Sequence, residues 1–215
     1  MDTLEALYTT RAMRRVKPDP IPEDVVRQML DAGIRAPSPG NAQPWRFVTV
    51  TDRELLGRLG ELYARSWGQL LSTVYAGRRE RALAAGDEVT QRVLTSSDWL
   101  AANFGQVPLV VLAYIRNDPD GSGIYPAVWN LMLAARTRGV GTTLTTALSH
   151  FAGQEVSELI GVPPDKGWRL AAAVTCGYPL GKWGVADRQP VENVVYAERW
   201  GEAPAWSVPE ALWSY

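Results

Sequence analysis

The sequence has one cysteine, one histidine and a formal charge of only −1 at pH 7, and each shortage excludes a kind of chemistry. Cys176 cannot form a disulfide within the chain, which fits a reducing compartment, and we expect it to be inert core packing. A serine–histidine triad would have to use His150, but no nucleophile-elbow pattern surrounds it. We therefore expect a structural or exposed histidine. No group of His, Cys or paired carboxylates has metal-ligand spacing, so no metal site is expected.

The low net charge and the short apolar runs limit the expected partners. The charge gives no global field for attracting nucleic acid or a membrane surface. The basic cluster at residues 11–17 has no interleaved aromatic residues, which argues against nucleic-acid binding. No apolar run approaches the roughly 18 residues that span a bilayer. Acids at Asp2 and Glu5 precede any basic cluster, unlike a secretory signal, so we expect a cytoplasmic protein.

The 215 residues, 46% of them hydrophobic, can bury one substantial core, which predicts a single domain over residues 1–215. Helical and strand-like segments are mixed without a regular βαβ repeat, so an α+β fold is favoured over a doubly wound sheet. No internal repeat and no low-complexity segment is found.

Hydrophobic spacing and turn residues locate the expected elements. Helices are predicted over residues 2–14, 22–36, 54–63, 88–104, 124–138 and 154–160. Strands are predicted over residues 47–51, 108–115 and 168–176. The helix at 124–138 is apolar nearly all round and should be the central core helix. The basic residues 78–81 are expected to form a solvated turn. The expected inward-facing side chains of the second and fourth helices are Val25, Val26, Met29, Leu30, Ile34, Val89, Val93, Leu94 and Leu100.

Residues 36–47 contain three prolines and a glycine, which forbid a regular helix or a central strand in the first nine positions. The segment is therefore a rigid loop that loses little further entropy on binding a ligand. Ser38, Asn41, Gln43 and Trp45 supply a hydroxyl, two carboxamides and an indole, which suit a planar ring with polar edges. An ordinary helix-to-strand connection explains the same composition, and the residues alone slightly favour it.

Two further segments leave alternatives open. Arg11 and Arg14 are three residues apart, so a helix would present both on one face. They form either a solvated basic turn or a phosphate clamp, because guanidinium groups match phosphate oxygens. The glycines of 139–141 precede a threonine-rich segment and can let the backbone approach a ligand, but so short a glycine signal is weak.

Three motifs resemble the nitroreductase-like flavoprotein family. The loop resembles its signature Ala-Pro-Ser, Asn, Gln-Pro-Trp and aromatic pattern, which falls on Ala36, Pro37, Ser38, Asn41, Gln43, Pro44, Trp45 and Phe47. Residues 11–14 are similar to its Arg-Ser-hydrophobic-Arg motif, with Ala12 in place of the serine. The segment 178–190 is similar to its late loop, where Arg188 matches an arginine and Ala186 stands at the position of a lysine.

The resemblance implies a bound FMN. Arg11, Arg14 and Arg188 would hold its phosphate and ribityl region, Leu144 would face the ring, and Thr145 and Thr146 would lie near N5. The loop would reach the flavin of a partner subunit. The full cofactor-binding set implied is Arg11, Ala12, Met13, Arg14, Pro37, Ser38, Pro39, Asn41, Gln43, Leu144, Thr145, Thr146 and Arg188.

The resemblance also implies the architecture: a nitroreductase-like fold with a central, mostly antiparallel sheet flanked by helices, in an intertwined homodimer. Residues 181–215, which hold four of the nine tryptophans (Trp183, Trp200, Trp206 and Trp213), would form an arm that packs on the partner subunit. Residues 191–200 would cross over as an edge strand.

The implied activity is FMN-dependent NAD(P)H oxidation by ping-pong hydride transfer through flavin N5. The acceptor would be a nitroaromatic, a quinone or another conjugated small molecule, and the flavin rather than a protein acid or base would carry the chemistry. Trp67, Tyr75 and Trp99 are candidates for stacking on the acceptor, although core packing explains them about as well. The alternatives are a specialised relative (flavin cleavage, dehalogenation or oxidation) and a non-catalytic flavin-binding dimer.

Overall fold

A computed structural model describes residues 1–208 of the chain, which fall into two compact units. The larger unit comprises Ala12–Lys182, and the smaller one comprises Met1–Arg11 and the chain from Trp183 onward.

An antiparallel sheet of four strands in the order β1-β2-β4-β3 forms the centre of the larger unit. The strands are β1 Trp45–Val50, β2 Leu109–Ile115, β3 Gly141–Thr145 and β4 Arg169–Gly177. The helices of this unit are α2 Glu23–Gly33, α3 Arg53–Ser72, α4 Arg78–Ala84, α5 Glu88–Asn103, α6 Ile124–Thr137, α7 Ala147–Phe151 and α8 Gly153–Ile160. Short 3₁₀ turns lie at Pro39–Asn41, Phe104–Gln106 and Pro164–Lys166. The predicted α+β class and the flanked antiparallel sheet are confirmed.

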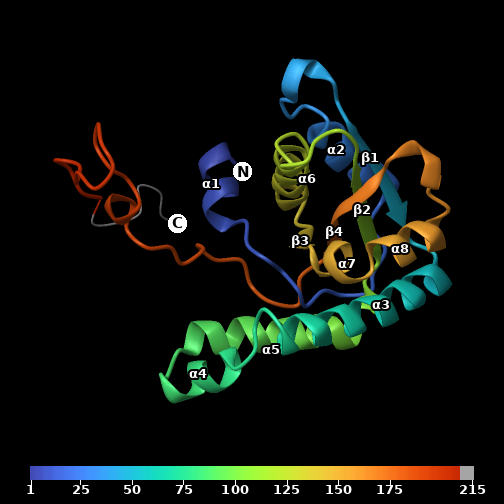
Figure 1. Cartoon of the computed structure of the whole chain (residues 1–215), viewed down its shortest axis with the longest axis horizontal. Coiled ribbons are helices and arrows are strands. Elements are labelled where there is room, and N and C mark those ends of the chain that lie inside the picture. The colour runs from blue at the N-terminus through green and yellow to red at the C-terminus, as the bar shows by residue number, and fades with distance from the viewer. Residues whose placement is uncertain (209–215) are drawn as a thin grey trace. The chain divides into compact units, whose positions relative to one another are not determined.

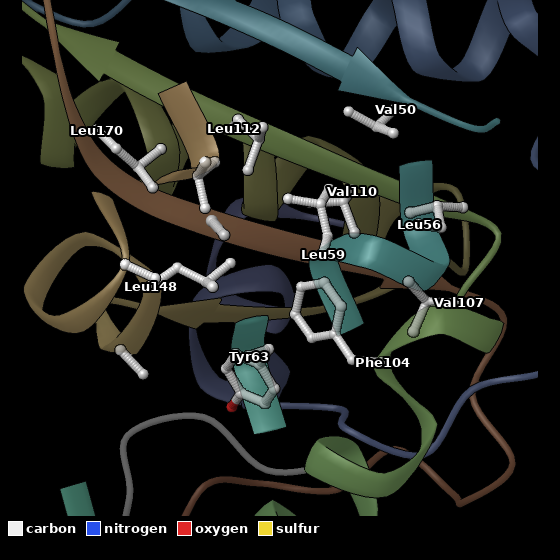
Figure 2. Close-up of a cluster of buried hydrophobic side chains, with 14 of the residues drawn as sticks. Val50, Leu56, Leu59, Tyr63, Phe104, Val107, Val110, Leu112, Leu148 and Leu170 are labelled. Atoms are coloured by element: carbon white, nitrogen blue, oxygen red, sulfur yellow. The ribbon is translucent and has the colours of Figure 1, made fainter. Parts of the chain in front are cut away.

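Helices cover both faces of the sheet, which explains why β2 is apolar throughout. Helices α2 and α6 lie on one face, and α3, α7 and α8 on the other (Figure 1). Alternate residues of β2 point to opposite sides: Val110 and Leu112 join the core on the α3 side, and Val111 joins the core on the α6 side. Figure 2 shows the cluster on the α3 side, where Leu56 and Leu59 meet the sheet.

Helix α6 is the core helix that the sequence predicts. Ile124, Val128 and Leu131 are completely buried against the sheet, although Trp129 remains 39% exposed. The prediction of an inward-facing side chain is wrong at Ile34, which is 42% exposed just after α2 ends.

The first predicted helix is too long. Helix α1 covers only Thr3–Thr9, so Arg11 and Arg14 do not share a helix face. The hydroxyls of Thr9 and Thr10 donate to the carbonyls of Glu5 and Ala6 at 2.7 and 2.6 Å. Such side-chain bonds compete with continuation of the helix, and the chain leaves it in an extended conformation.

Residues 78–81 open helix α4 and do not form the expected solvated turn. The left-handed Gly77 (φ 66°) starts this helix, and the ion pair of Arg79 with Asp98 at 2.6 Å ties it to α5. Helix α5 also turns its valines outward: Val89 and Val93 are 48% and 40% exposed, contrary to the prediction.

The sequence patterns missed strand β3 and helix α7. Strand β3 is short and rich in threonine, so it has no apolar run to mark it. It forms because the edge of β4 supplies hydrogen-bond partners, with Thr143 opposite Thr175.

In the smaller unit, the N–H of Ala186 donates to the carbonyl of Tyr8 at 3.0 Å, so residues from the two ends of the chain lie side by side. A 3₁₀ turn, Val191–Asn193, lies within the segment expected to cross over, and within residues 1–208 that segment pairs with no strand of its own chain. Trp200 is 91% exposed and Trp206 is 51% exposed. Trp213 lies outside the described residues. None of the helices in residues 1–208 has both the length and the apolar character needed to cross a membrane.

Candidate functional site

The segment that follows Arg11 runs alongside the end of the sheet. The N–H of Met13 donates to the carbonyl of Thr142 at 2.9 Å, and the N–H of Lys17 donates to the carbonyl of Tyr178 at 2.8 Å. A Cβ on Gly141 would come within 2.7 Å of the Met13 Cβ, so this close approach requires glycine. Met13, a predicted site residue, thus lies beside the start of the strand that leads to the predicted residues Leu144, Thr145 and Thr146.

Arg14 is a half-buried cation where this segment lies beside strand β3. Its Nη1 donates to the Ser96 hydroxyl of helix α5 at 3.1 Å. Burial lowers the pKa of Arg14, and the neighbouring Tyr63 and Tyr75 partly offset that effect. No carboxylate of residues 1–208 lies within 4.0 Å of this guanidinium. A desolvated guanidinium without a counter-charge is suited to binding an anion.

Tyr63 lies close to Arg14 and to Thr145, and both act on its hydroxyl. Tyr63 is 3% exposed, and burial raises its pKa, while a hydrogen bond with the Thr145 side chain and the Arg14 charge oppose that rise. The Thr145 hydroxyl also accepts from the N–H of Ala147 at 3.3 Å. Leu144, Thr145 and Thr146 are all partly exposed, so a ligand can reach this segment.

The proline-rich loop is held by its own polar side chains. The Ser38 hydroxyl accepts from the N–H of Gln43 at 3.0 Å, and the Gln43 amide donates to the Asn41 oxygen at 3.2 Å. Asn41 and Gln43 have φ of 54° and 48°, in the left-handed region that a glutamine rarely adopts. Such backbone strain is common at functional sites. Pro37, Pro39, Asn41 and Gln43 are exposed, as a ligand-contacting loop requires.

A cavity of about 440 Å³ opens beside this loop. Arg46 and Arg116 place their guanidinium groups 5.0 and 4.8 Å from the Trp168 ring, which also lines the cavity. The remaining lining residues are Pro39, Ala42, Gln43, Pro44, Asn117, Asp118, Pro119, Asp120 and Ser122.

The three candidates for acceptor stacking lie in different environments. Trp67 is only 7% exposed, and its indole N–H donates to Asp98 at 2.9 Å. Tyr75 meets the Trp67 ring edge-on at 6.0 Å and carries the Arg78 guanidinium 4.7 Å from its ring. Trp99 is a half-buried residue of α5. The structure therefore brings Trp67 and Tyr75 into contact, and of these two the half-buried Tyr75 is the more accessible to a ligand.

Arg11 and Arg188 belong to the smaller unit, and both are exposed. The Arg188 guanidinium donates to the Asp187 carbonyl at 2.7 Å. Their grouping with Arg14 stays a prediction. His150 is exposed and Cys176 is completely buried, as their sequence contexts predict, and burial raises the pKa of the Cys176 thiol.

Sequence reasoning missed Tyr63 and Ser96 as members of this site. Tyr63 is on helix α3 and Ser96 is on helix α5. Tyr63 reaches Arg14 and Thr145, and Ser96 reaches Arg14, only through tertiary packing. The only available signal was local: each is a polar side chain within an amphipathic helix.

An antiparallel sheet lies between two helical layers, and the segment that contains Arg14 runs along the edge of this sheet. These features define an α+β protein of the nitroreductase fold. A family model described as "Nitroreductase family" matches residues 7–178, and the chain belongs to this family.

Named relatives differ in their reactions. The chain is 29% identical over 204 residues to an NADH dehydrogenase of Thermus thermophilus, covering 91% of this chain and 95% of the relative. It is 28% identical to a 5,6-dimethylbenzimidazole synthase of Rhodospirillum rubrum, covering 83% and 82%. Among solved structures, an iodotyrosine deiodinase bound to FMN and 3-iodo-L-tyrosine superposes with a TM-score of 0.70 at 26% identity, covering 86% and 94%.

Proposed function

We propose that this chain is an FMN-dependent oxidoreductase that takes hydride from NADH or NADPH and passes electrons to a conjugated small molecule, such as a nitroaromatic or a quinone. The observation that carries the proposal is Arg14, a half-buried guanidinium beside strand β3 with no carboxylate within 4.0 Å among residues 1–208. Such a group fits the anionic part of a flavin nucleotide. The FMN-bound relative of similar fold supports the same ligand.

The chain's own residues would bind and orient the flavin. Arg14, Arg11 and Arg188 would supply three positive charges against a phosphate of about −1.5 to −2. The turn at Thr145–Thr146 would lie near N5, with Leu144 facing the ring. When bound, FMN supplies the hydride exchange, so the site needs no protein acid or base of its own.

The proposal includes a homodimer. The rigid loop at Pro37, Ser38 and Pro39 would reach the flavin of the partner subunit, and Asn41 and Gln43 would keep it in shape through their mutual hydrogen bond. Residues 181–215 would form the arm that packs on the partner, where the exposed Trp200 could be covered. We regard the chain as one functional domain, and its single cysteine suits the cytoplasm.

The test is the visible spectrum of the purified protein, followed by anaerobic titration with NADH and with NADPH. The proposal requires a yellow protein that bleaches with at least one dinucleotide and regains colour on adding a nitroaromatic or a quinone. A colourless protein that ignores added FMN would refute it. A flavin that binds but resists both dinucleotides would indicate a non-catalytic flavin-binding dimer.

A second candidate reaction is reductive dehalogenation of a halogenated phenol. It is favoured by the deiodinase structure, whose TM-score of 0.70 accompanies 26% identity. Chemically reduced protein mixed with 3-iodotyrosine under anaerobic conditions would then release iodide. If the first proposal holds instead, the reduced protein would reduce a nitroaromatic but would release no iodide from 3-iodotyrosine.

A further inference from the structure

The cavity of about 440 Å³ beside the proline-rich loop lies at one end of the sheet. Arg46 belongs to β1, Arg116 follows the last residue of β2, and Trp168 precedes the first residue of β4. These three strands are neighbours, so their ends together form the base of the cavity. The other end of β4 leads to Tyr178, beside the segment that contains Arg14, so the two sites lie at opposite ends of this strand. We call this space the Trp168 cavity.

Two guanidinium groups meet one indole ring in the Trp168 cavity. Arg46 and Arg116 lie 5.0 and 4.8 Å from the centroid of the Trp168 ring, which is half-buried and therefore holds both cations in place. Neither guanidinium lies within 4.0 Å of a carboxylate among residues 1–208. Arg46 donates to the carbonyl of Trp45 at 2.7 Å, and Arg116 lies 3.5 Å from the carbonyl of Lys166. Since a guanidinium has several N–H donors, both arginines keep donors for a ligand.

Two carboxylates line the same cavity, and their environments differ. Asp118 is 6% exposed, and its oxygens accept from the backbone N–H groups of Ser122 and Gly123 at the start of α6. Its charge is therefore engaged by the positive end of that helix. Asp120 is exposed and pairs with no cation among residues 1–208. The charges that a ligand meets are thus two arginines against one aspartate, which favours an anion.

Both walls of the Trp168 cavity are fixed by hydrogen bonds within the chain. One wall is the proline-rich loop, where the N–H of Gln43 donates to the Ser38 hydroxyl at 3.0 Å. The other wall is the turn before α6, where Arg169 donates to the carbonyl of Asp118 at 2.9 Å. Gln43 and Asn117, one on each wall, have φ of 48° and 57° in the left-handed region. Such backbone strain is common at functional sites, and a preformed cavity loses little entropy on binding.

We propose that the Trp168 cavity binds a small organic anion, an aromatic molecule whose phosphate or carboxylate group lies on Arg46 and Arg116. Guanidinium groups match the oxygens of both head groups. The rings of Trp168, Pro44 and Pro119 give the aromatic body an apolar lining, and the volume falls in the range of small-molecule sites. Arg46, Arg116 and Trp168 lie outside the predicted flavin-binding set, so this inference goes beyond the proposed function.

The test is calorimetric titration of the protein as purified with four probes: phenyl phosphate, benzoate, phenol and inorganic phosphate. At least one of the two aromatic anions should bind more tightly than phenol and than inorganic phosphate, by about threefold or more. The anion preferred by the parent protein identifies the head group. Arg46→Met and Arg116→Met should each weaken its binding by roughly threefold to tenfold. Asp120→Asn should strengthen it by about twofold, because a like charge is removed.

Two further arginine variants locate the bound anion. Arg58→Met removes an exposed arginine of α3 outside the cavity and should keep parental affinity. Arg14→Met should also keep it. Loss of binding in Arg14→Met, with parental affinity in Arg46→Met and Arg116→Met, would place the anion beside β3 and overturn this inference.

The remaining outcomes are equally decisive. Equal affinity for phenol and for both aromatic anions would show that the arginines take no part, and no binding of either anion up to about 10 mM would show that the cavity is not a site for them. The indole N–H signal of Trp168 in the parent's NMR spectrum should shift on adding the preferred anion, and a signal that stays in place at saturation would put the ligand elsewhere. A protein that ignores FMN but passes these tests would lose the proposed function and keep this site.

Discussion

The backbone N–H of Met13 donates to the carbonyl oxygen of Thr142 at 2.9 Å. This bond places the segment that contains Met13 and Arg14 along the first residues of strand β3. The candidate site therefore depends on a contact between segments far apart in the chain.

Arg14→Met should weaken FMN binding by roughly tenfold to a hundredfold, because a hydrogen bond to a charged group contributes about 1.5–3 kcal/mol. The same change should leave the free energy of unfolding of the flavin-free protein equal or higher. Burial already lowers the pKa of this guanidinium, so folding works against its charge. Fluorescence titration with FMN and urea unfolding measure the two effects.

The control for that variant is Arg15→Met. Arg15 is exposed, and among the partners within residues 1–208 its backbone carbonyl alone is engaged, by the N–H of Leu180 at 2.9 Å. It should keep parental FMN affinity. Loss of stability in Arg14→Met with unchanged FMN affinity would mean that Arg14 is a structural residue.

Gly60→Ala should destabilise the protein by about 1–3 kcal/mol, because the new Cβ would lie 2.9 Å from the Gly105 backbone nitrogen and cannot be relieved by a side-chain rotation. Gly57→Ala, one turn earlier in α3, points into open space and should stabilise it by about 0.5–1 kcal/mol through helix propensity. Thermal unfolding of the two variants should therefore shift in opposite directions. A shift of both in the same direction would contradict the close packing of α3.

Thr175→Val should raise the free energy of unfolding by up to about 1 kcal/mol. The Thr175 hydroxyl is buried and has no hydrogen-bond partner among residues 1–208, and burying a polar group unpaired is unfavourable. Thr10→Val is the opposite case, because the buried Thr10 hydroxyl donates to Ala6 at 2.6 Å, and it should cost about 0.5–1.5 kcal/mol. Denaturant unfolding of both variants compares the two hydroxyls. A destabilised Thr175→Val would reveal a partner for that oxygen.

Elements with a strong local pattern were predicted correctly from the sequence. Strand β2 is a continuous apolar run, so burial on both of its faces could be read from composition, and the largely apolar sequence of α6 predicted its place in the core. Helix α4 and strand β3 were missed because contacts with residues distant in the sequence stabilise them. Arg79 of α4 pairs with the Asp98 carboxylate, and Thr143 of β3 lies opposite a residue of β4. Local propensity gives way to tertiary pairing in both.

The candidate site divides in the same way. The proline-rich loop could be predicted to be rigid because its prolines and Gly40 stand in the loop's own sequence. The structure adds the hydrogen bonds of Ser38 and Gln43. Tyr63 and Ser96 could not have been predicted, since each meets the site only after α3 and α5 have packed. No spacing rule links Arg14 to a serine 82 positions away.

Asp118→Asn should lower stability by about 1 kcal/mol near neutral pH, and this difference should disappear in acid. Asp118 is 6% exposed, and its two carboxylate oxygens accept from the backbone N–H groups of Ser122 and Gly123, both at 2.9 Å. Burial alone would raise its pKa, but these hydrogen bonds and those from the Ser122 hydroxyl and the Ile124 N–H lower it below the ordinary 3.8.

The direction of the pH effect follows from that lowered pKa. Because the folded-state pKa lies below the unfolded-state value, the carboxylate stabilises the fold fully above the unfolded value, and this contribution is lost as the pH falls through the folded one. In thermal unfolding from pH 7 down to pH 2.5, the difference between parent and Asp118→Asn should therefore stay constant down to about pH 4 and shrink as the pH falls further. Asp120→Asn, an exposed carboxylate on the rim of the same cavity, should follow the parent throughout. A stability difference for Asp118→Asn that persists unchanged to pH 2.5 would show that the amide disturbs packing, and that the carboxylate charge contributes nothing at the start of α6.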